Sequence, residues 1–357
     1  MLTVLAFFTL YLNPASAEVP LRQPQLAADG HTAVLAYGAG KSIFVAVSSD
    51  QGATFSKPVK VAEAEVLPLG RHRGPRVAVS GSTIVVTAVV GKRRAEGPHA
   101  HGLPGDGDLM AWYSSDRGAT WSAGRPVNDV PSAAREGLHT LAGDGRGRVF
   151  AAWLDLRRQG TRLYGAFSKD GGATWNRNVL VYESPGGTIC ECCHPSASFS
   201  PSGSLWVMWR NSLEGSRDLY AAHSNDFTHF SPAQKLGNGT WLLKACPMDG
   251  GGIAAGGNQV VTAWRRESDI YRAEPGKPET MLGAGKDPAI AQSGDQTFIV
   301  WNEGGGIVLW SNGSSIRKLS QKGAFPSITG LPGASAVTAW EQDGGIAVEV
   351  VHSGGRH

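Results

Sequence analysis

Three thiols and an imidazole lie within five residues near the middle of the chain, in Thr188-Ile-Cys190-Glu-Cys192-Cys193-His194-Pro195. A packing strand would alternate its side chains between two faces, so this spacing indicates a site rather than a core element. Gly186 and Gly187 precede the segment and permit a tight turn that directs the four groups to one centre. Soft sulfur ligands with an imidazole suit Cu(I) or Zn(II), and C-x-C-C is closer to copper–thiolate sites than to the C-x-x-C pairs of structural zinc. The segment therefore predicts copper or zinc binding.

The fourth cysteine of the chain, Cys246, stands in Cys246-Pro-Met248. We expect it to lie beside the cluster, which makes the predicted metal ligands Cys190, Cys192, Cys193, His194 and Cys246. Two alternatives stay open at this point. The four cysteines can form two disulfides, one from Cys246 to the cluster and one strained bridge within it, or they can form a redox-active or mixed site.

The chemistry of cysteine depends on the compartment, and the start of the chain predicts export. Residues 2–12 form an uncharged apolar run of 11 residues, and Ala15-Ser16-Ala17 supplies the small-x-small pattern of a signal peptidase site. The run is shorter than the about 20 residues that cross a bilayer, and no other segment has membrane length. We therefore expect a signal peptide over residues 1–17, cleavage after Ala17, and a periplasmic or secreted chain of residues 18–357 in an oxidising compartment.

Composition and charge exclude some classes of protein and favour an all-β fold. The 357 residues include 33 Lys and Arg against 30 Asp and Glu, a net charge of +3 without a basic tract, so no nucleic-acid partner is indicated. The 48 glycines, 20 prolines and 11 tryptophans are typical of many tight turns between short strands that bury aromatic side chains.

An octapeptide repeat marks a set of turns. Three copies of S-x-D-x-G-x-T-[FW] each follow an apolar run, and a worn fourth copy lacks the glycine; they span Ser48–Phe55, Ser114–Trp121, Ser168–Trp175 and Ser224–Phe230. We interpret each as a hairpin turn in which Asp accepts backbone N–H groups, Gly takes a positive φ and the aromatic residue packs inward. These octapeptides resemble the Asp-box, or BNR, repeats of the sialidase superfamily, whose members are β-propellers. The resemblance implies a propeller with Asp-box hairpins on the rim away from any active site.

A second, longer repeat divides the whole chain into units. A short strand that ends in glycine, followed by a strand with an aromatic or bulky residue, recurs with centres at Tyr37, Val89, Trp153, Trp209, Trp264, Trp301 and Trp340. Seven such units predict a single β-propeller domain of seven four-stranded blades over residues 18–357. Six blades are the alternative, because sialidase catalytic domains have six. The seventh unit stops one strand short, and we expect Glu18 to Leu21 to supply the missing strand.

The expected topology assigns candidate functional residues to one rim. In an up-and-down blade, the first strand begins and the second strand ends on the same rim, opposite the octapeptide turns. Charged and metal-capable side chains are therefore expected near the axis on that rim: Arg73, His194 and Cys246 before first strands, and Asp155, Arg210 and Arg265 after second strands.

Members of the sialidase superfamily use three arginines to bind the substrate carboxylate, a Tyr/Glu pair as nucleophile and an Asp as acid/base. The resemblance implies Arg73, Asp155, Arg210 and Arg265 as catalytic candidates. No tyrosine follows Tyr271, however, although the nucleophile of the family comes late in the chain. The favoured interpretation is an exported, monomeric propeller that acts as a metal-binding or binding-scaffold protein, with room at the rim for an acidic glycan or a protein. A sialidase-like glycoside hydrolase is the alternative.

Overall fold

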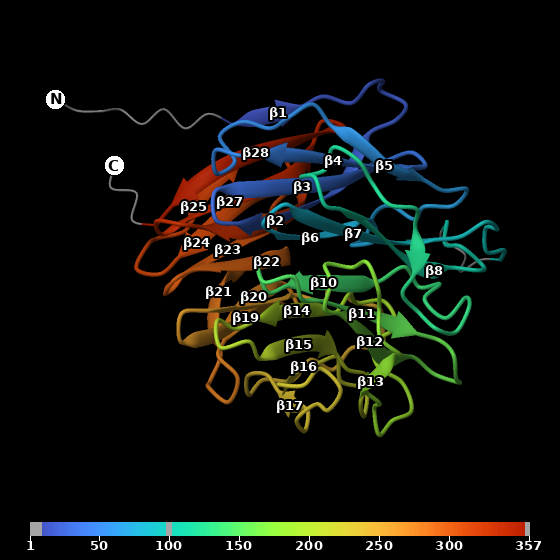
Figure 1. The fold of residues 1–357 in the computed structure, drawn as a ribbon. Coiled ribbons are helices and arrows are strands. Elements are labelled where there is room, and N and C mark those ends of the chain that lie inside the picture. The colour runs from blue at the N-terminus through green and yellow to red at the C-terminus, as the bar shows by residue number, and fades with distance from the viewer. Residues whose placement is uncertain (1–8, 98–101, 354–357) are drawn as a thin grey trace.

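A ring of seven four-stranded antiparallel sheets makes up the protein (Figure 1). The computed structural model describes residues 9–97 and 102–353, and within these ranges all regular secondary structure is β-strand. The prediction of an all-β, seven-bladed propeller is confirmed, and the six-bladed alternative is wrong. Over the same ranges no helix has the length and apolar character that a membrane crossing requires.

Blades 1 to 4 are each built from four consecutive strands. They are β2 (Leu21–Asp29), β3 (Thr32–Ala39), β4 (Ser42–Ser48) and β5 (Val59–Glu63) in blade 1; β6 (Arg76–Ser80), β7 (Thr83–Val90), β8 (Asp108–Ser114) and β9 (Arg125–Pro126) in blade 2; β10 (His139–Gly143), β11 (Val149–Asp155), β12 (Arg162–Ser168) and β13 (Val179–Tyr182) in blade 3; and β14 (Ser196–Phe199), β15 (Leu205–Arg210), β16 (Leu219–Ser224) and β17 (Gln234–Lys235) in blade 4.

Blades 5 and 6 follow the same plan, whereas blade 7 combines the two ends of the chain. The strands are β18 (Gly252–Gly256), β19 (Gln259–Arg266), β20 (Asp269–Ala273) and β21 (Thr280–Ala284) in blade 5; β22 (Lys286–Ser293), β23 (Gln296–Glu303), β24 (Gly306–Ser311) and β25 (Arg317–Ser320) in blade 6; and β26 (Ala324–Leu331), β27 (Ser335–Gln342), β28 (Gly345–His352) and β1 (Leu10–Leu12) in blade 7. The first strands of neighbouring blades contact one another in a closed circle from β2 through β26, so they line the axis.

The second strand of each blade is buried on both faces, which accounts for its apolar sequence. Every residue of β11 is buried, and the tryptophans at the centres of four units, Trp153, Trp209, Trp301 and Trp340, are at most 1 % exposed. Trp153 belongs to the same apolar cluster as Val85 of blade 2. The centres of the sequence repeat are therefore positions at which neighbouring blades pack together.

The octapeptides form the turns between third and fourth strands, as expected. In blade 1, the Asp50 carboxylate accepts hydrogen bonds from the backbone N–H and the hydroxyl of Thr54, at 2.9 and 2.6 Å. The Ser48 hydroxyl accepts one from the Gly52 N–H at 2.8 Å. Gly52 has a φ of 86°, and a Cβ atom there would come within 2.9 Å of Val337 on β27 of blade 7. The turn therefore requires glycine and rests on the preceding blade.

The other copies repeat this arrangement to different degrees. Asp116 and Asp170 make the same two bonds to Thr120 and Thr174, at 2.9 and 2.6 Å in both turns. In the worn copy, which lacks the glycine, the carboxylate of Asp226 accepts from the backbone N–H groups of residues 228 and 229, at 2.9 and 2.8 Å. The sequence repeat is thus one kind of turn that occurs in blades 1 to 4.

The strand that closes blade 7 comes from the start of the chain, but not from the residues that were expected. β1 pairs antiparallel with β28, with Leu10 opposite Val348. The prediction that Glu18 to Leu21 supplies this strand is wrong, because Leu21 begins the innermost strand of blade 1, where it pairs with Ala39. β1 lies within the predicted signal peptide, of which residues 1–8 are outside the described ranges. Cleavage after Ala17 would therefore remove one strand of blade 7.

Candidate functional site

The cysteine segment forms a turn just before β14, on the rim where first strands begin. The backbone N–H of Ile189 donates to the carbonyl of Thr161 at 3.0 Å, and that of Cys190 donates to the carbonyl of Arg210 at 3.1 Å. Gly187 has a φ of 82°, the left-handed conformation in which glycine is favoured. Two neighbouring loops therefore fix the turn, and glycine allows its sharp start.

The sulfur atoms of the turn form a nearly equilateral triangle. The Sγ of Cys190 lies 3.6 Å from that of Cys192 and 3.5 Å from that of Cys193, and the third side is 4.0 Å. The three side chains are at most 7 % exposed, and the partly buried Met248 packs against them. All four cysteines of the chain are free, since these separations exceed the about 2.05 Å of a disulfide bond.

These separations suit sulfurs that share one metal ion. The circle through the three Sγ atoms has a radius of about 2.1 Å, and a zinc–thiolate bond is about 2.3 Å long. An ion slightly above the plane of the triangle would reach all three sulfurs without a change in the backbone. It would also keep one coordination position open on the side away from the triangle.

Cys246 lies next to Cys192, although it belongs to the loop before β18 of the next blade. Partial desolvation by neighbouring atoms, followed by the interaction with the Cys192 thiol, raises the pKa of Cys246 to about 11. Its side chain is exposed, unlike those of the triangle. The structure thus places an accessible fourth thiol at the edge of a buried group of three.

The three buried thiols differ in their affinity for protons. Hydrogen bonds from the thiols of Cys192 and Cys193 lower the pKa of Cys190. The bond to Cys190 raises the pKa of Cys192, and burial raises that of Cys193 well above its ordinary value. Cys190 is therefore the thiol of the triangle that loses its proton most readily. A metal ion held by three thiolates would displace the protons that remain on the sulfurs, so binding would release them to the solvent.

Two of the arginines expected to bind a substrate lie beside the cysteines. Arg210 interacts electrostatically with Cys190 and Cys193. Its charge adds to the lowering of the Cys190 pKa and partly offsets the effect of burial on the pKa of Cys193. Arg73 interacts in the same way with Cys192 and Cys193. Positive charge next to a thiol favours the thiolate, which is both the nucleophile and the metal ligand.

The protein engages all three nitrogens of the Arg210 guanidinium, and the Nε of Arg73 and of Arg265. Arg210 is 1 % exposed, and its guanidinium donates to the backbone carbonyls of residues 217, 249 and 265. The Nε of Arg73 donates to the carbonyl of Glu136 at 2.7 Å. The Nε of Arg265 donates to the carbonyl of Glu267 at 2.6 Å. Arg210 therefore supports the backbone of the rim, whereas Arg73 and Arg265 each donate to one backbone carbonyl.

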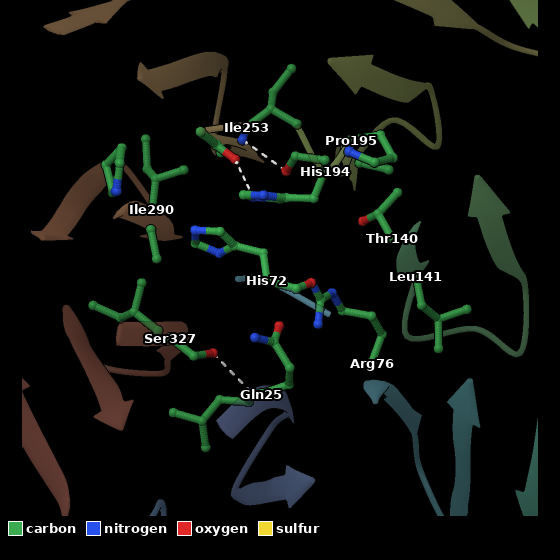
Figure 2. Close-up of a pocket in the computed structure, with 18 of the residues that line it drawn as sticks. Gln25, His72, Arg76, Thr140, Leu141, His194, Pro195, Ile253, Ile290 and Ser327 are labelled. Carbon is green, nitrogen blue, oxygen red and sulfur yellow. Dashed lines mark hydrogen bonds between the residues drawn. The ribbon is translucent and has the colours of Figure 1, made fainter. Parts of the chain in front are cut away.

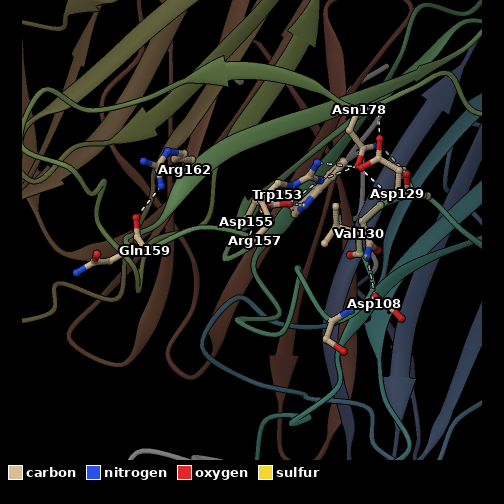
Figure 3. Close-up of polar contacts among 12 residues, drawn as sticks. Asp108, Asp129, Val130, Trp153, Asp155, Arg157, Gln159, Arg162 and Asn178 are labelled. Atoms are coloured by element: carbon tan, nitrogen blue, oxygen red, sulfur yellow. Dashed lines mark hydrogen bonds and ion pairs between the residues drawn. The ribbon is translucent and has the colours of Figure 1, made fainter.

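Asp155, the expected acid/base, is held inside blade 3 (Figure 3). It is 1 % exposed, and its carboxylate accepts hydrogen bonds from Trp153 Nε1 at 2.8 Å and from the Nε of Arg157 at 2.8 Å. Arg157 also donates to Asp129 and Asn178 at 2.9 and 2.8 Å, which ties the end of β11 to the adjacent loops. A carboxylate enclosed by an indole and a guanidinium positions its neighbours and does not face a substrate.

His194 is not part of the sulfur triangle, and in this respect the predicted ligand set is corrected. Its imidazole faces the axial cavity, where it stacks on His72, and its Nε2 lies 3.1 Å from the carbonyl oxygen of Gly251 (Figure 2). His194 lies between the cysteine turn and β14 and lines the axial cavity, whereas the Cys193 thiol packs with the other two sulfurs. Burial, followed by the charge of His72, lowers the pKa of His194 well below its ordinary value.

A second group of ligand-capable side chains, His72, Asp249 and Asp287, lies on the same rim with one ligand atom of each within 4.8 Å of the others. His72 Nε2 is 2.8 Å from Asp287 Oδ1, and Asp249 accepts the backbone N–H groups of Asp287 and Gly251 at 2.8 and 3.2 Å. These bonds join loops of blades 2, 5 and 6. Asp249 was not predicted from the sequence, although its place just before a first strand was an available signal. Arg76, which follows Pro75 at the start of β6, was not predicted either.

Comparison with known proteins places the fold. No family model matches the sequence, and no curated protein matches it. The α-L-arabinanase of Penicillium chrysogenum is similar with a TM-score of 0.55 and 12 % identity over 98 % of each chain. The intramolecular trans-sialidase of Ruminococcus gnavus is similar with a TM-score of 0.53 and 11 % identity over 93 % of this chain and 94 % of that one.

A third similar structure is virginiamycin B lyase of Staphylococcus aureus, with a TM-score of 0.55 and 13 % identity over 97 % of this chain and 99 % of that one. At such identities the likeness concerns the fold alone. The shared ring of four-stranded blades nevertheless extends over nearly the whole of each chain. The chain therefore has the sialidase-like β-propeller fold.

Proposed function

We propose that the protein is an exported propeller that binds one thiophilic metal ion, Cu(I) or Zn(II), through the thiolates of Cys190, Cys192 and Cys193. The observation that carries the proposal is the triangle of their sulfurs, with sides of 3.5, 3.6 and 4.0 Å. Thiolates are the ligands that select such ions. The octapeptide turns, which we assign as Asp-box repeats, make the ring a firm scaffold for this rim.

The surroundings of the triangle favour copper over zinc. Met248 packs against the three thiols and brings a thioether, a ligand type that prefers Cu(I). The cluster is buried, which protects a reduced metal ion from water and oxidants. Arg73 and Arg210 supply positive charge that offsets the negative charge of several thiolates.

The exposed Cys246 suggests how an ion would reach the buried sulfurs. It lies at the edge of the triangle beside Cys192 and is the only one of the four cysteines that is exposed. A carrier protein or small thiol that delivers the ion would meet Cys246 first, and the ion would then pass to the three buried thiolates. This arrangement suits a protein that holds or transfers a metal ion.

A glycoside hydrolase is the second candidate, because an arabinanase and a trans-sialidase share the fold. The geometry favours it less. Asp155 is bound by Arg157, and Arg210 donates to three backbone carbonyls, so neither is free for a substrate. A carboxylate subsite on this rim would therefore rest on Arg73 and Arg265, whose Nε atoms donate to backbone carbonyls.

Titration of the full chain, purified without oxygen, tests the metal proposal. We expect one equivalent of Cu(I) or Zn(II) per chain, with at least three thiols protected from a thiol-reactive dye. Cys190→Ser and Cys193→Ser should each abolish tight binding, whereas Cys246→Ser should slow metal uptake and retain the stoichiometry. Glu191→Gln is the matched control, because it alters the same turn without removing a sulfur.

Two results would count against the proposal. One is intact-mass analysis showing disulfides in the purified protein, together with no metal binding after reduction. The other is release of the aglycone from a fluorogenic sialoside or arabinoside that survives Cys190→Ser and is lost in Arg265→Ala, which would support the hydrolase instead.

A further inference from the structure

A cavity of about 180 Å³ lies on the axis of the ring, lined by the first strands of all seven blades. Figure 2 shows the side chains of Arg76 and His72 reaching toward its middle. The polar side chains around it include His72, Arg76, Thr140, His194, Ser196 and Ser327. Among the described residues that line the cavity, none is Asp or Glu. The cavity is therefore rich in hydrogen-bond donors and poor in negative charge.

Arg76 is a buried cation without a counter-charge. It is 7 % exposed, and two of its nitrogens donate to the carbonyls of Pro75 and His72 at 3.1 and 2.6 Å. No carboxylate within the described ranges forms an ion pair with it, whereas Arg157 and Arg266 each face one at 2.8 and 2.5 Å. Burial lowers the pKa of Arg76 to about 10. A charge held away from water without a partner is costly to the folded state.

Hydroxyl groups from three blades face the same space with protons to donate. Ser196 Oγ accepts the backbone N–H of Ile253 at 3.1 Å, and Ser327 Oγ accepts that of Leu26 at 3.0 Å. Because each oxygen already accepts a bond from a neighbouring blade, its O–H proton is available to the cavity. Thr140, on β10, adds a third hydroxyl.

We propose that the axial cavity binds a small oxoanion, such as a carboxylate, sulfate or phosphate group, against the guanidinium of Arg76. A guanidinium matches two oxygens of such a group, and the hydroxyls of Thr140, Ser196 and Ser327 complete its surroundings. The carboxylate of Asp287 does not compete for Arg76, since it is engaged by His72 at 2.8 Å. None of these residues is a predicted metal ligand, so the inference does not rest on the metal proposal.

Thermal melts and calorimetric titration of the full chain test the inference. The probes are sodium acetate, sulfate and phosphate at constant ionic strength, with sodium chloride as the reference. We expect at least one oxoanion to raise Tm saturably above the chloride value, with one site per chain, because a ligand of the native state stabilises it. The three probes also distinguish a carboxylate from an inorganic oxoanion as the preferred ligand.

Variants localise the response. Arg76→Gln should abolish it, and the Tm of the variant in chloride is the reference for its response to each oxoanion, because the variant removes the charge together with donors to the carbonyls of Pro75 and His72. Thr140→Val should raise Kd several-fold, because it removes the hydroxyl and keeps the shape of the side chain. Arg71→Gln, at an exposed position in the loop before β6, should leave Kd unchanged.

The inference is overturned if no probe gives a saturable response, or if Arg76→Gln responds like the wild type. Should Arg76→Gln fail to fold, an unchanged Kd in Thr140→Val overturns it instead. Cys190→Ser should keep the anion response, so failure of the metal proposal is distinguishable from failure of this one.

Discussion

His72 and His194 stack in the axial cavity with ring centroids 4.3 Å apart and planes inclined by 28°. They come from blades 2 and 4, so the propeller axis, and not the neighbouring cysteine turn, fixes the orientation of His194. The Nε2 of His194 lies 3.1 Å from the carbonyl oxygen of Gly251 on blade 5. Two residues adjacent in sequence, Cys193 and His194, therefore belong to two different sites.

The separation of these sites predicts that His194 is dispensable for metal binding. His194→Gln should bind the same number of Cu(I) or Zn(II) equivalents as the wild type, because its imidazole is turned away from the sulfurs. Cys193→Ser, one position earlier, should bind none tightly. Metal content after gel filtration is the measurement, and a loss of metal in His194→Gln equal to that in Cys193→Ser would show that the imidazole is a ligand.

Acid should destabilise the protein through His139. Burial, followed by the charge of Arg76, lowers the pKa of His139 from 6.5 to about 3 in the folded state. Between these pH values His139 is protonated in the unfolded chain and stays neutral in the folded chain. The free energy of unfolding therefore falls as the pH drops. The limiting slope is about 1.4 kcal/mol per pH unit. Denaturant unfolding of the wild type and His139→Gln at pH 7 and pH 4.5 measures the contribution.

We expect His139→Gln to be less stable than the wild type at pH 7, because Thr87 loses its imidazole partner, yet to lose less stability on acidification. An equal pH dependence in both proteins would mean that other groups govern acid unfolding.

Arg210 should matter for stability far more than Arg265 does. Truncation of Arg210 to Met leaves three buried carbonyls without donors, and the expected loss is about 3 kcal/mol in the free energy of unfolding. Arg265→Met removes a single bond from a more exposed side chain and should cost less than about 1 kcal/mol. Similar losses in urea unfolding of the two variants would contradict the bracing role of Arg210.

The octapeptide turns should contribute through their aspartates. Asp170→Ala removes the acceptor for the backbone N–H and the hydroxyl of Thr174, so we expect a loss of about 1 kcal/mol in the free energy of unfolding. Asp295→Ala, at an exposed position in the turn between β22 and β23, is the matched control and should be neutral. If both variants melt alike, the repeated carboxylate has no stabilising role.

Removal of residues 1–17 should leave β28 as an unpaired edge. We expect the chain that starts at Glu18 to melt several degrees below a chain that starts at Thr9 and keeps β1, and to self-associate, because an exposed edge strand pairs with other chains. Thermal melts and light scattering compare the two, and the mass of the protein purified from its own cells shows which form exists. Identical melting would mean that three strands suffice for blade 7.

Much of the fold was predictable because every unit repeats one local pattern. A glycine at the end of the first strand and a bulky residue in the second, such as Trp153 or Trp209, occur once per blade, so counting them counts the blades. β1 was not predictable in this way. An apolar run such as Leu10–Leu12 is typical of both a signal peptide and a half-buried edge strand, so the sequence alone did not indicate its pairing with β28.

The candidate site was predictable in part for a related reason. Blade topology placed Cys246 on the correct rim, and the structure brings it beside Cys192. The direction of His194 depends on where the cysteine turn ends and β14 begins, which spacing alone does not specify. Arg76 stood out only after the structure showed a buried guanidinium without a carboxylate, because an arginine in a first strand is typical of a solvated rim.

The contacts of the octapeptide glycines connect some neighbouring blades more firmly than others. Gly52 of blade 1 rests on Val337 of blade 7, and Gly172 of blade 3 rests on Val85 of blade 2. Opening one of these blades therefore disturbs the next, whereas blades 5 and 6 carry no such turn. Amide hydrogens should accordingly exchange first in blades 5 and 6, because these blades can open locally without disturbing such a glycine contact.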